Sequence, residues 1–232
     1  MKIERRFFVV IHALSNYTYA PKAWEHVEKS AELAYANGAD GVFLIPDYQK
    51  GEAAAMMDDL FHFYTSLRSR YEGRDFKIGV NFLSRKIERY FLQREKFQML
   101  QMDCLTASKL DLPETEIFAG LAFKYSESVN ATGAELREIC EKIAPHAHVP
   151  TTSGTKTGIS PTPEKIKEIK SYIPKNSRLG VASGVDEKNV KALITAGATD
   201  FLVATSLIKE VEDKMDILDG QKISALAKAI KI

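Results

Sequence analysis

Two short polar turns near the end of the sequence carry residue types that bind phosphate. Ser183-Gly184 and Thr205-Ser206 each follow a short β-branched run and lead toward a helix. A glycine lets backbone N–H groups approach an anion closely, and the first N–H groups of a helix lack intrahelical partners. Together the two turns predict a phosphate-binding site. Taken singly, Ser183-Gly184 is also compatible with a plain turn, and Thr205-Ser206 with a helix cap.

A third polar segment, residues 153–161, contains two glycines that bracket one cation. Gly154 and Gly158 flank Lys156, and three hydroxyl side chains stand nearby. This pattern is typical of a mobile flap that closes over an anion and brings Lys156 and the backbone of Gly154 to it. The alternative is a solvated loop with a surface lysine.

Polar residues that follow the earlier apolar runs are candidates for catalysis. His12 is a candidate general acid or base, because imidazole titrates near neutral pH, and it is equally a candidate for a hydrogen-bonded core histidine. Lys124 could anchor an anionic substrate, act as a base, or form a Schiff base once burial lowers its pKa. The alternative for Lys124 is a structural ion pair with Asp47 or Asp103. The polar residues expected at these strand ends are His12, Asp47, Asn81, Ser108, Lys109, Lys124 and Thr152, of which His12, Asp47, Asn81 and Lys124 form the candidate catalytic set.

Neither a metal nor a cofactor is predicted. Asp47 is the one carboxylate expected beside His12, and this pair supplies too few ligands for a metal ion. The sequence contains no H-x-x-x-H pattern, P-loop, nucleophile elbow or redox motif. Cys104 and Cys140 show neither metal-ligand spacing nor a disulfide framework, which fits a reducing cytoplasm.

The elements that position these residues alternate between strand and helix. Short β-branched and aromatic runs predict strands at residues 7–12, 41–45, 77–82, 103–108, 117–124, 149–153, 179–183 and 201–205. Apolar residues at helical spacing predict helices near 24–34, 56–67, 87–100, 136–143, 164–173, 186–196 and 223–230. The segment 109–116 after the fourth strand is too short for a full helix.

This alternation predicts a (β/α)8 barrel that forms a single domain over residues 1–232. Strands separated by helices require crossover connections and a parallel sheet, and eight such units favour closure into a barrel. No G-x-G-x-x-G follows the first strand, which argues against a dinucleotide-binding fold. In such barrels the ligand lies on the loops after the strands, and a phosphate often lies beyond strands seven and eight.

The same residues resemble the BtpA/SgcQ family. The resemblance is carried by Ser153-Gly154-x-x-Thr157-Gly158-x-x-Pro161, by Ser183-Gly184-Val185 with Asn189-Val190, by Val203-x-Thr205-Ser206-Leu207, and by Gly79-Val80-Asn81 with Leu83. His12 and Lys124 fall where the family's first- and fifth-strand motifs have His and Lys. The resemblance spans nearly the whole chain, is specific only from Ser153 to Leu207, and implies a barrel of the ribulose-phosphate-binding type.

Several candidate catalytic groups of that family are replaced in this chain. The acidic-Asn pair after the family's second strand is Ile45-Pro46 here, and its Asn-Asp after the third strand is Arg85-Lys86. On either side of the fifth-strand lysine the family has Asp and His, where this chain has Gly120 and Tyr125. The resemblance therefore implies a kept phosphate end and an altered catalytic set.

Composition excludes several other classes of partner. The chain has 232 residues, of which 45% are hydrophobic and 27% charged, with 32 Lys and Arg against 31 Asp and Glu. There is no basic excess to neutralise nucleic-acid phosphates, and no stretch approaches the ~18 apolar residues of a membrane span. The apolar run after Arg6 is short and ends at His12, so a first strand is favoured over a signal peptide. We expect a cytoplasmic protein with no nucleic-acid or membrane partner, and the sequence is compatible with a homo-oligomer.

Two functions are consistent with these residues. The first is an enzyme that binds a phosphorylated sugar or phosphoribosyl compound and catalyses isomerisation, epimerisation or lyase-type proton transfer. The second is a sensor or assembly factor related to BtpA that binds a phosphorylated small molecule without turnover, which the replaced acidic groups favour.

Overall fold

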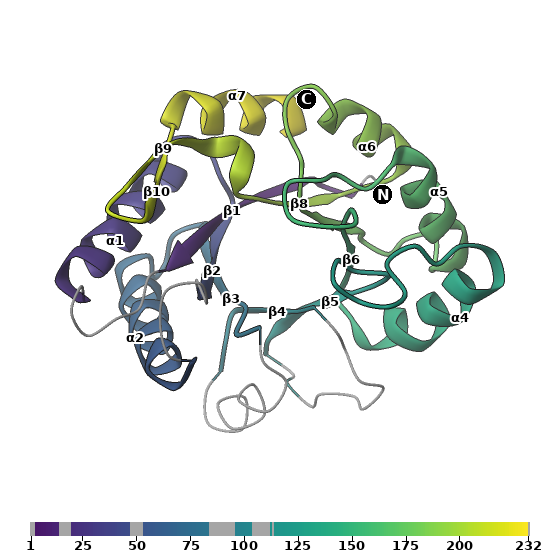
Figure 1. Ribbon diagram of the computed structural model, residues 1–232, viewed down its shortest axis with the longest axis horizontal. Coiled ribbons are helices and arrows are strands. Elements are labelled where there is room, and N and C mark those ends of the chain that lie inside the picture. Colours follow the sequence, from purple (N-terminus) through teal and green to yellow (C-terminus); the bar gives the residue numbers. More distant parts are fainter. Residues whose placement is uncertain are drawn as a thin grey trace.

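The computed structural model is a closed barrel of parallel strands with helices outside (Figure 1). The structure describes residues 3–13, 20–46, 53–83, 96–103, 112 and 114–231, with the side chains of 20 and 53–58 left out of the description. Each strand pairs with its neighbour in sequence order, and the eighth closes the barrel on the first. The predicted (β/α)8 barrel and its single domain are confirmed.

The strands are short and almost wholly buried. They are β1 (Arg6–Ala13), β2 (Gly41–Pro46), β3 (Lys77–Val80), β4 (Met99–Met102), β5 (Glu116–Gly120), β6 (Val149–Thr152), β7 (Gly180–Ala182) and β8 (Asp200–Val203). Continuous apolar runs of this kind suit a parallel sheet, which the barrel interior covers on one face and the helices on the other.

The helices lie around the barrel and each buries one face against it. They are α1 (Ala20–Ala36), α2 (Ala53–Arg70), α4 (Gly133–Ile143), α5 (Pro163–Tyr172), α6 (Val190–Ala196) and α7 (Gly220–Lys231), with single 3-10 turns η2 (Ala144–His146) and η3 (Thr205–Leu207). Helix α5 shows why such segments form. The Thr162 hydroxyl accepts the Lys165 N–H at 3.2 Å, proline occupies the first turn, and Ile166 and Ile169 are buried. Helix α6 begins at Val190, four residues later than predicted.

Three aromatic rings fill the middle of the barrel. Phe8, Phe43 and Phe118 come from β1, β2 and β5, and their ring centroids lie 5.0–5.7 Å apart in edge-to-face pairs. Gly79 makes room for this packing, because a Cβ there would meet the Phe43 ring at 2.5 Å. The interior is therefore a packed core, and only the strand ends are available for a ligand.

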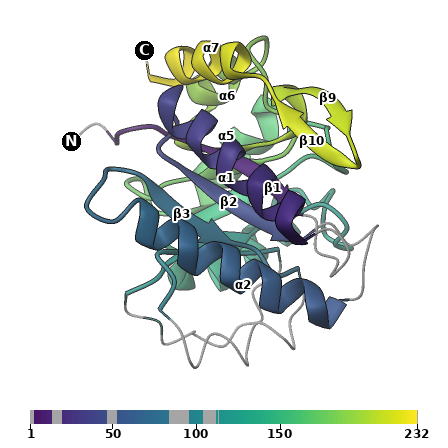
Figure 2. The same ribbon diagram turned by 90° about the vertical axis from the view of Figure 1, so that its left-hand side faces the viewer.

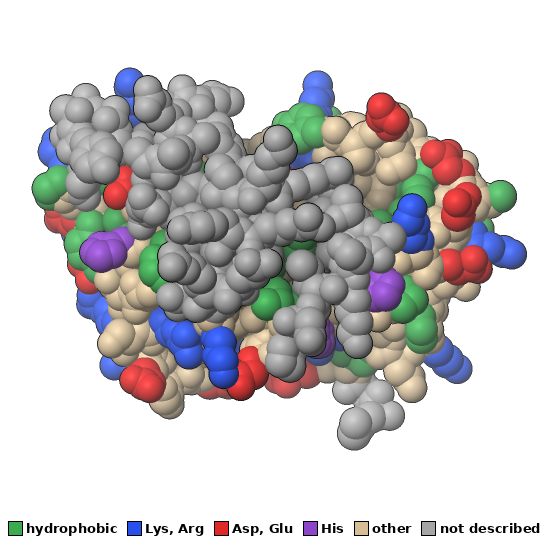
Figure 3. Space-filling view, turned by 90° about the horizontal axis from the view of Figure 1, so that it is seen from below, with side chains coloured by type: hydrophobic (Ala, Val, Ile, Leu, Met, Phe, Trp, Pro, Cys, Tyr) green, Lys and Arg blue, Asp and Glu red, His purple; other side chains and the backbone are tan. Residues whose placement is uncertain are grey.

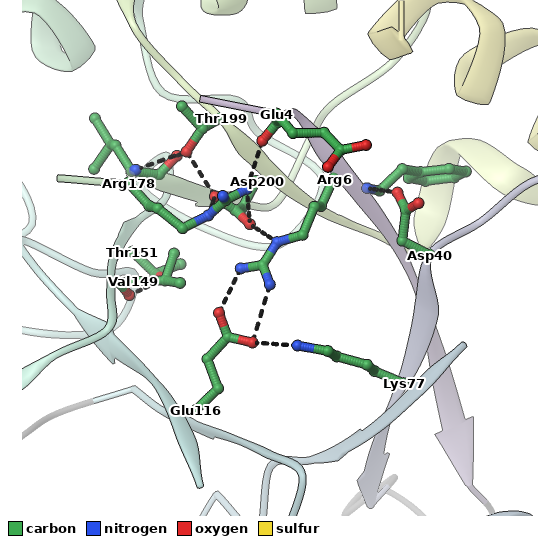
Figure 4. Close-up of polar contacts among 12 residues, drawn as sticks. Glu4, Arg6, Asp40, Lys77, Glu116, Val149, Thr151, Arg178, Thr199 and Asp200 are labelled. Carbon is green, nitrogen blue, oxygen red and sulfur yellow. Dashed lines mark hydrogen bonds and ion pairs between the residues drawn. The ribbon is translucent and has the colours of Figure 1, made fainter. Parts of the chain in front are cut away.

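The amino-terminal ends of the strands are held by a network of charged side chains (Figure 4). Arg6 lies beneath the rings of Phe8 and Phe118 and donates two hydrogen bonds to Glu116, at 3.0 and 2.7 Å. The same guanidinium donates to Asp200 at 2.6 Å, and the fully buried Asp200 also accepts hydrogen bonds from Arg178. The network joins the starts of β1, β5 and β8 and closes this end of the barrel.

The fourth strand is not where the sequence pattern placed it. Strand β4 covers Met99–Met102, whereas residues 103–108 were expected, so Asp103 follows the strand instead of beginning it. Phe97 and Leu100 fit a helical spacing in the sequence, but Phe97 precedes the strand and Leu100 lies within it. A short, continuous apolar run is ambiguous between a buried strand and a buried helix, and this ambiguity produced the error. Residues 87–95 of the expected helix lie outside the described residues.

A β-hairpin between β8 and α7 was also not predicted. Strands β9 (Ile208–Glu212) and β10 (Met215–Leu218) pair antiparallel outside the barrel. The turn residues Asp213 and Lys214 both have positive φ, 47° and 69°, as a two-residue type I′ turn requires. Because neither is glycine, the usual sequence signal for such a turn is missing. Figure 2 shows the hairpin beside α1.

Charged side chains of both signs lie on the face of the molecule in Figure 3. On the face in Figure 3, acidic and basic side chains are interspersed over the coloured part of the surface, in keeping with the near balance of the two signs. Among the described residues, every helix is too short or too polar to cross a membrane.

Candidate functional site at the barrel mouth

One cavity at the carboxyl ends of the strands brings together six of the ten predicted site residues. They come from four strands or the segments after them: His12, Lys124, Ser183, Gly184, Thr205 and Ser206. Gln101 of β4 and Thr157 of the loop after β6 also line this cavity. The strand order explains the gathering, because parallel strands direct all their carboxyl ends to one face of the barrel.

The turns after β7 and β8 are tied to each other. The Ser206 hydroxyl donates to the Val185 carbonyl at 2.6 Å, and the Asn189 amide donates to the Gly184 carbonyl at 2.7 Å. Within the described part of the chain, the backbone N–H groups of Gly184, Thr205 and Ser206 have no hydrogen-bond acceptor. Backbone N–H donors without an acceptor, held at a cavity by such hydrogen bonds, are groups that can bind an anion.

The loop after β6 packs against the β7 turn. Gly184 has φ +63°, and any Cβ on it would overlap the backbone of Ile159 and Ser160. Gly154 packs against the same two residues. This close packing, and not only access for an anion, accounts for glycine at positions 154 and 184.

Two hydroxyl groups hold the tip of this loop. The Ser183 hydroxyl accepts the Gly158 N–H at 3.1 Å, and the Tyr125 hydroxyl lies 2.9 Å from the Thr157 hydroxyl. Thr157 thereby reaches the cavity, whereas Lys156 is exposed and is not among the residues that line it. In this arrangement the loop contributes a hydroxyl to the mouth, while its lysine faces solvent.

His12 is paired with a residue of the unpredicted hairpin. Its Nδ1 lies 2.9 Å from Oδ2 of Asp216 in β10, and both side chains are mostly buried, with exposed fractions of 30% and 22%. The other ring nitrogen, Nε2, has no hydrogen-bond partner among the described residues. His12 therefore lines the cavity with one nitrogen held and the other free.

Lys124 enters the same cavity from the segment after β5. The fully buried Ser153 fixes its backbone, because the Ser153 hydroxyl accepts the Lys124 N–H at 2.7 Å. The Lys124 ammonium lies 5.8 Å from the centroid of the Phe123 ring. Its charge favours the ionised form of Asp103, the ion-pair alternative considered from the sequence, although no direct contact joins the two.

Asn81 lies at the mouth but is engaged by neighbouring residues. Its amide donates to Asp103 at 2.8 Å, and its carbonyl oxygen accepts the Leu83 N–H at 2.9 Å. Gln101 donates to the same carboxylate oxygen of Asp103 at 3.2 Å. Burial raises the pKa of Asp103, and the charge of Lys124 and the two amide hydrogen bonds oppose that rise. The cluster can hold or release a proton closer to neutral pH than an exposed Asp.

Several expected positions lie elsewhere. The Val149 side chain packs in the barrel interior with Phe118, so strand alternation turns Thr151 inward and Thr152 outward, away from the mouth. The expected inward position of Thr152 was wrong by one residue. Asp47, Ser108 and Lys109 lie outside the described residues.

Three residues at the mouth were not expected there from the sequence. Gln101 and Asp103 were missed because the fourth strand was placed too late, and Asp216 because the hairpin has no Gly or Asn in its turn. The Gln101 side-chain oxygen is buried and has no hydrogen-bond partner among the described residues. A buried polar atom without a partner is costly, which points to a role at the site. No group of three or more His, Cys, Asp or Glu side chains in the described ranges is arranged to hold a metal ion.

Fold and site define this chain as a (β/α)8 barrel with a polar pocket at its carboxyl mouth. No family model matches the sequence, and no curated protein matches it. Membership of the BtpA/SgcQ family accordingly stays a prediction.

Solved structures of other proteins share the whole barrel. The native KDPGal structure is 15% identical with a TM-score of 0.64, over 99% of this chain and 96% of that one. Phosphoribosyl anthranilate isomerase from Thermus thermophilus is 11% identical with a TM-score of 0.63, over 97% of this chain and 98% of that one. Orotidine 5′-phosphate decarboxylase from Pyrococcus horikoshii OT3 is 12% identical with a TM-score of 0.61, over 97% and 99%. At these identities the likeness establishes the fold.

Proposed function

We propose that the mouth of the barrel binds the phosphate group of a phosphorylated small molecule at the turns after β7 and β8. The observation that carries the proposal is the set of free N–H groups of Gly184, Thr205 and Ser206 around one cavity. A hydrogen bond to a charged group contributes on the order of 1.5–3 kcal/mol, so a few such donors suffice for specific binding before association entropy is subtracted. The Ser206–Val185 hydrogen bond keeps the two turns together in advance of binding.

The rest of the cavity supports proton-transfer chemistry on the bound molecule. Beyond the phosphate turns it offers an imidazole, His12, and an ammonium, Lys124. The imidazole can exchange a proton with the ligand, and the ammonium can stabilise the negative charge that remains. This set suits isomerisation, epimerisation or a lyase reaction of a phosphosugar or phosphoribosyl compound. The names of three structural neighbours, phosphoribosyl anthranilate isomerase, orotidine 5′-phosphate decarboxylase and thiamine phosphate pyrophosphorylase, each contain a phosphorylated small molecule, which supports the coarser proposal of a phosphorylated ligand.

A binding protein without turnover is the second candidate. Both ends of the Asn81 amide are already used in hydrogen bonds with the chain itself, so one member of the candidate catalytic set is not free to act on a ligand. Turnover of a panel of phosphorylated sugars would favour the enzyme, and binding of the same panel without turnover would favour the sensor.

The phosphate site is tested by a charge placed at Thr205. This residue is exposed, lines the cavity and begins η3, so its substitution does not disturb the core. Thr205→Asp should weaken the binding of inorganic phosphate and of ribose 5-phosphate by at least about tenfold, equivalent to about 1.4 kcal/mol, because the carboxylate repels the anion. Gly184 is unsuitable for this test, since any side chain there would overlap the loop after β6.

The matched control is Thr205→Asn, which has the same shape as the aspartate variant without its charge. Titration calorimetry should give nearly wild-type affinity for Thr205→Asn and no measurable difference among the three proteins toward ribose itself. Equal affinity of the Asp and Asn variants for ribose 5-phosphate would contradict the phosphate site.

A further inference from the structure

The β9–β10 hairpin reaches the candidate site although the barrel closes without it. It follows β8 and η3, and it contacts α1 and β1. At its tip, Asp213 accepts a hydrogen bond from Lys22 of α1 at 3.0 Å. The outer residues of the hairpin, 209–213, are exposed, whereas Asp216 of β10 is mostly buried against the end of β1.

The contact between Asp216 and His12 decides which imidazole nitrogen holds the proton. A carboxylate can only accept a hydrogen bond, so the 2.9 Å contact requires a proton on Nδ1 of His12. In the neutral ring the lone pair is then on Nε2, the nitrogen that has no partner among the described residues. Because the ring lines the cavity, this lone pair is available to a bound ligand.

A second histidine, His26, also interacts with the charge of Asp216. His26 of α1 is only 7% exposed, and it lines a separate cavity of about 280 Å³ between α1 and the hairpin. Burial lowers the pKa of His26, the charge of His12 lowers it further, and the charge of Asp216 opposes both. The carboxylate of Asp216 is in hydrogen-bond contact with His12, whereas His26 lines the other cavity.

We propose that Asp216 is a positioning residue that holds His12 in its Nδ1–H form, so that Nε2 is the proton acceptor of the mouth site. When Nε2 removes a proton from a C–H or O–H group of the ligand, the new N–H bond forms on His12 and the electron pair stays on the ligand. The carboxylate of Asp216 stabilises the resulting imidazolium and is not itself protonated. This role rests on the proposed function for its chemistry, but the tautomer can be measured without any ligand.

The test is the tautomer of His12 in ¹⁵N-labelled protein. At a pH where the imidazole is neutral, long-range ¹H–¹⁵N spectra should show the proton on Nδ1 of His12 in the wild type, with the signal identified by its loss in His12→Gln. In Asp216→Asn the amide can donate to Nδ1, so the proton should move to Nε2. Asp216→Glu keeps a carboxylate and should restore the Nδ1–H form.

The control is Asp213→Asn, which replaces an exposed carboxylate on the same hairpin and should leave the His12 signals unchanged. A His12 that carries its proton on Nε2 in the wild type, or that keeps the Nδ1–H form in Asp216→Asn, would overturn the proposal. The phosphate site fails separately, if the wild type does not distinguish ribose 5-phosphate from ribose. If turnover is found, Asp216→Asn should lower kcat and leave KM largely unchanged, since Asp216 is not among the residues that line the mouth cavity.

Discussion

At the scale of the residue, several side chains at the mouth serve the fold, while the proposed phosphate site uses their backbone N–H groups. The hydroxyl of Ser206 bridges to the β7 turn, and that of Ser183 receives the N–H of Gly158 from the neighbouring loop. Their value to a phosphate lies in the N–H groups that these contacts hold in place. The two lysines near the mouth also differ, since Lys124 lines the cavity and Lys156 does not.

Lys124 should matter for anion binding, and Lys156 should not. Lys124 is half-buried and lines the cavity, so Lys124→Gln should weaken ribose 5-phosphate binding by about tenfold or more, because an ion pair is stronger where water is partly excluded. Lys156→Gln is the matched control. Its side chain is exposed, and an exposed charge contributes only about 0–1 kcal/mol.

Titration calorimetry of both variants at two salt concentrations separates the two lysines. The outcome that would contradict this account is a larger loss in Lys156→Gln than in Lys124→Gln. That result would favour a flap that delivers its lysine to the phosphate.

Residue-level prediction from the sequence placed residues at the cavity where they lie near the carboxyl end of a predicted strand. His12, Lys124, Ser183 and Thr205 all line one cavity, and each lies at or just after the end of a run that predicts a strand. The sequence did not predict contacts between residues that are far apart in the chain. Asp216 meets His12 across 204 residues of sequence, and no local pattern encodes that contact.

At the scale of the element, the positions of the strand ends decide which residues reach the site. Most strands were predicted to within a few residues, because short β-branched runs between helical patterns are distinctive. The fourth strand was misplaced because Met99–Met102 is only four residues long and mostly apolar, and its neighbours fit a helical spacing. Because of that shift, Gln101 and Asp103 were not predicted to lie at the end of the fourth strand. The starts of the strands, by contrast, carry charges whose role is stability.

Removal of one charge from the network at the strand starts should make the protein less stable and less sensitive to acid. Burial raises the pKa of Glu116, but hydrogen bonds and charges from Arg6 and Lys77 outweigh it, so the pKa lies below its usual value of 4.5. A lowered pKa means stabilisation that is complete above pH 4.5 and is lost as the pH falls through the folded-state value. Glu116→Gln should therefore cost about 1.5–3 kcal/mol near pH 7, and the difference from wild type should shrink below pH 4.5.

Urea unfolding of both proteins across this pH range measures the effect. Glu114→Gln is the control, because Glu114, two residues before Glu116, forms an exposed ion pair with Lys96 whose loss should be small. A Glu116→Gln deficit that is the same at pH 3 as at pH 7 would show that the charge of Glu116 is not the source of the stabilisation.

At the scale of the whole molecule, the barrel separates the groups that stabilise the fold from the proposed ligand site along its axis. The amino-terminal end is closed by the ion pairs of Arg6, Glu116 and Asp200, and the middle by packed aromatic rings. The carboxyl end carries polar groups with free hydrogen-bonding capacity around a cavity. The alternation of strands and helices in the sequence was sufficient to predict the barrel and the end at which the cavity with His12, Lys124 and the two polar turns lies. The alternation did not predict the hairpin that brings Asp216 to His12, since the turn of the hairpin lacks glycine.

The position of a bound phosphate tests the central claim most directly. A crystal structure of the wild-type protein with ribose 5-phosphate should place the phosphorus atom over the turns after β7 and β8. Its oxygens should lie within hydrogen-bond distance of the N–H groups of Gly184, Thr205 and Ser206, with the sugar directed toward His12 and Lys124. A phosphate bound at Lys156 or elsewhere on the surface, with those N–H groups facing only water, would contradict the account.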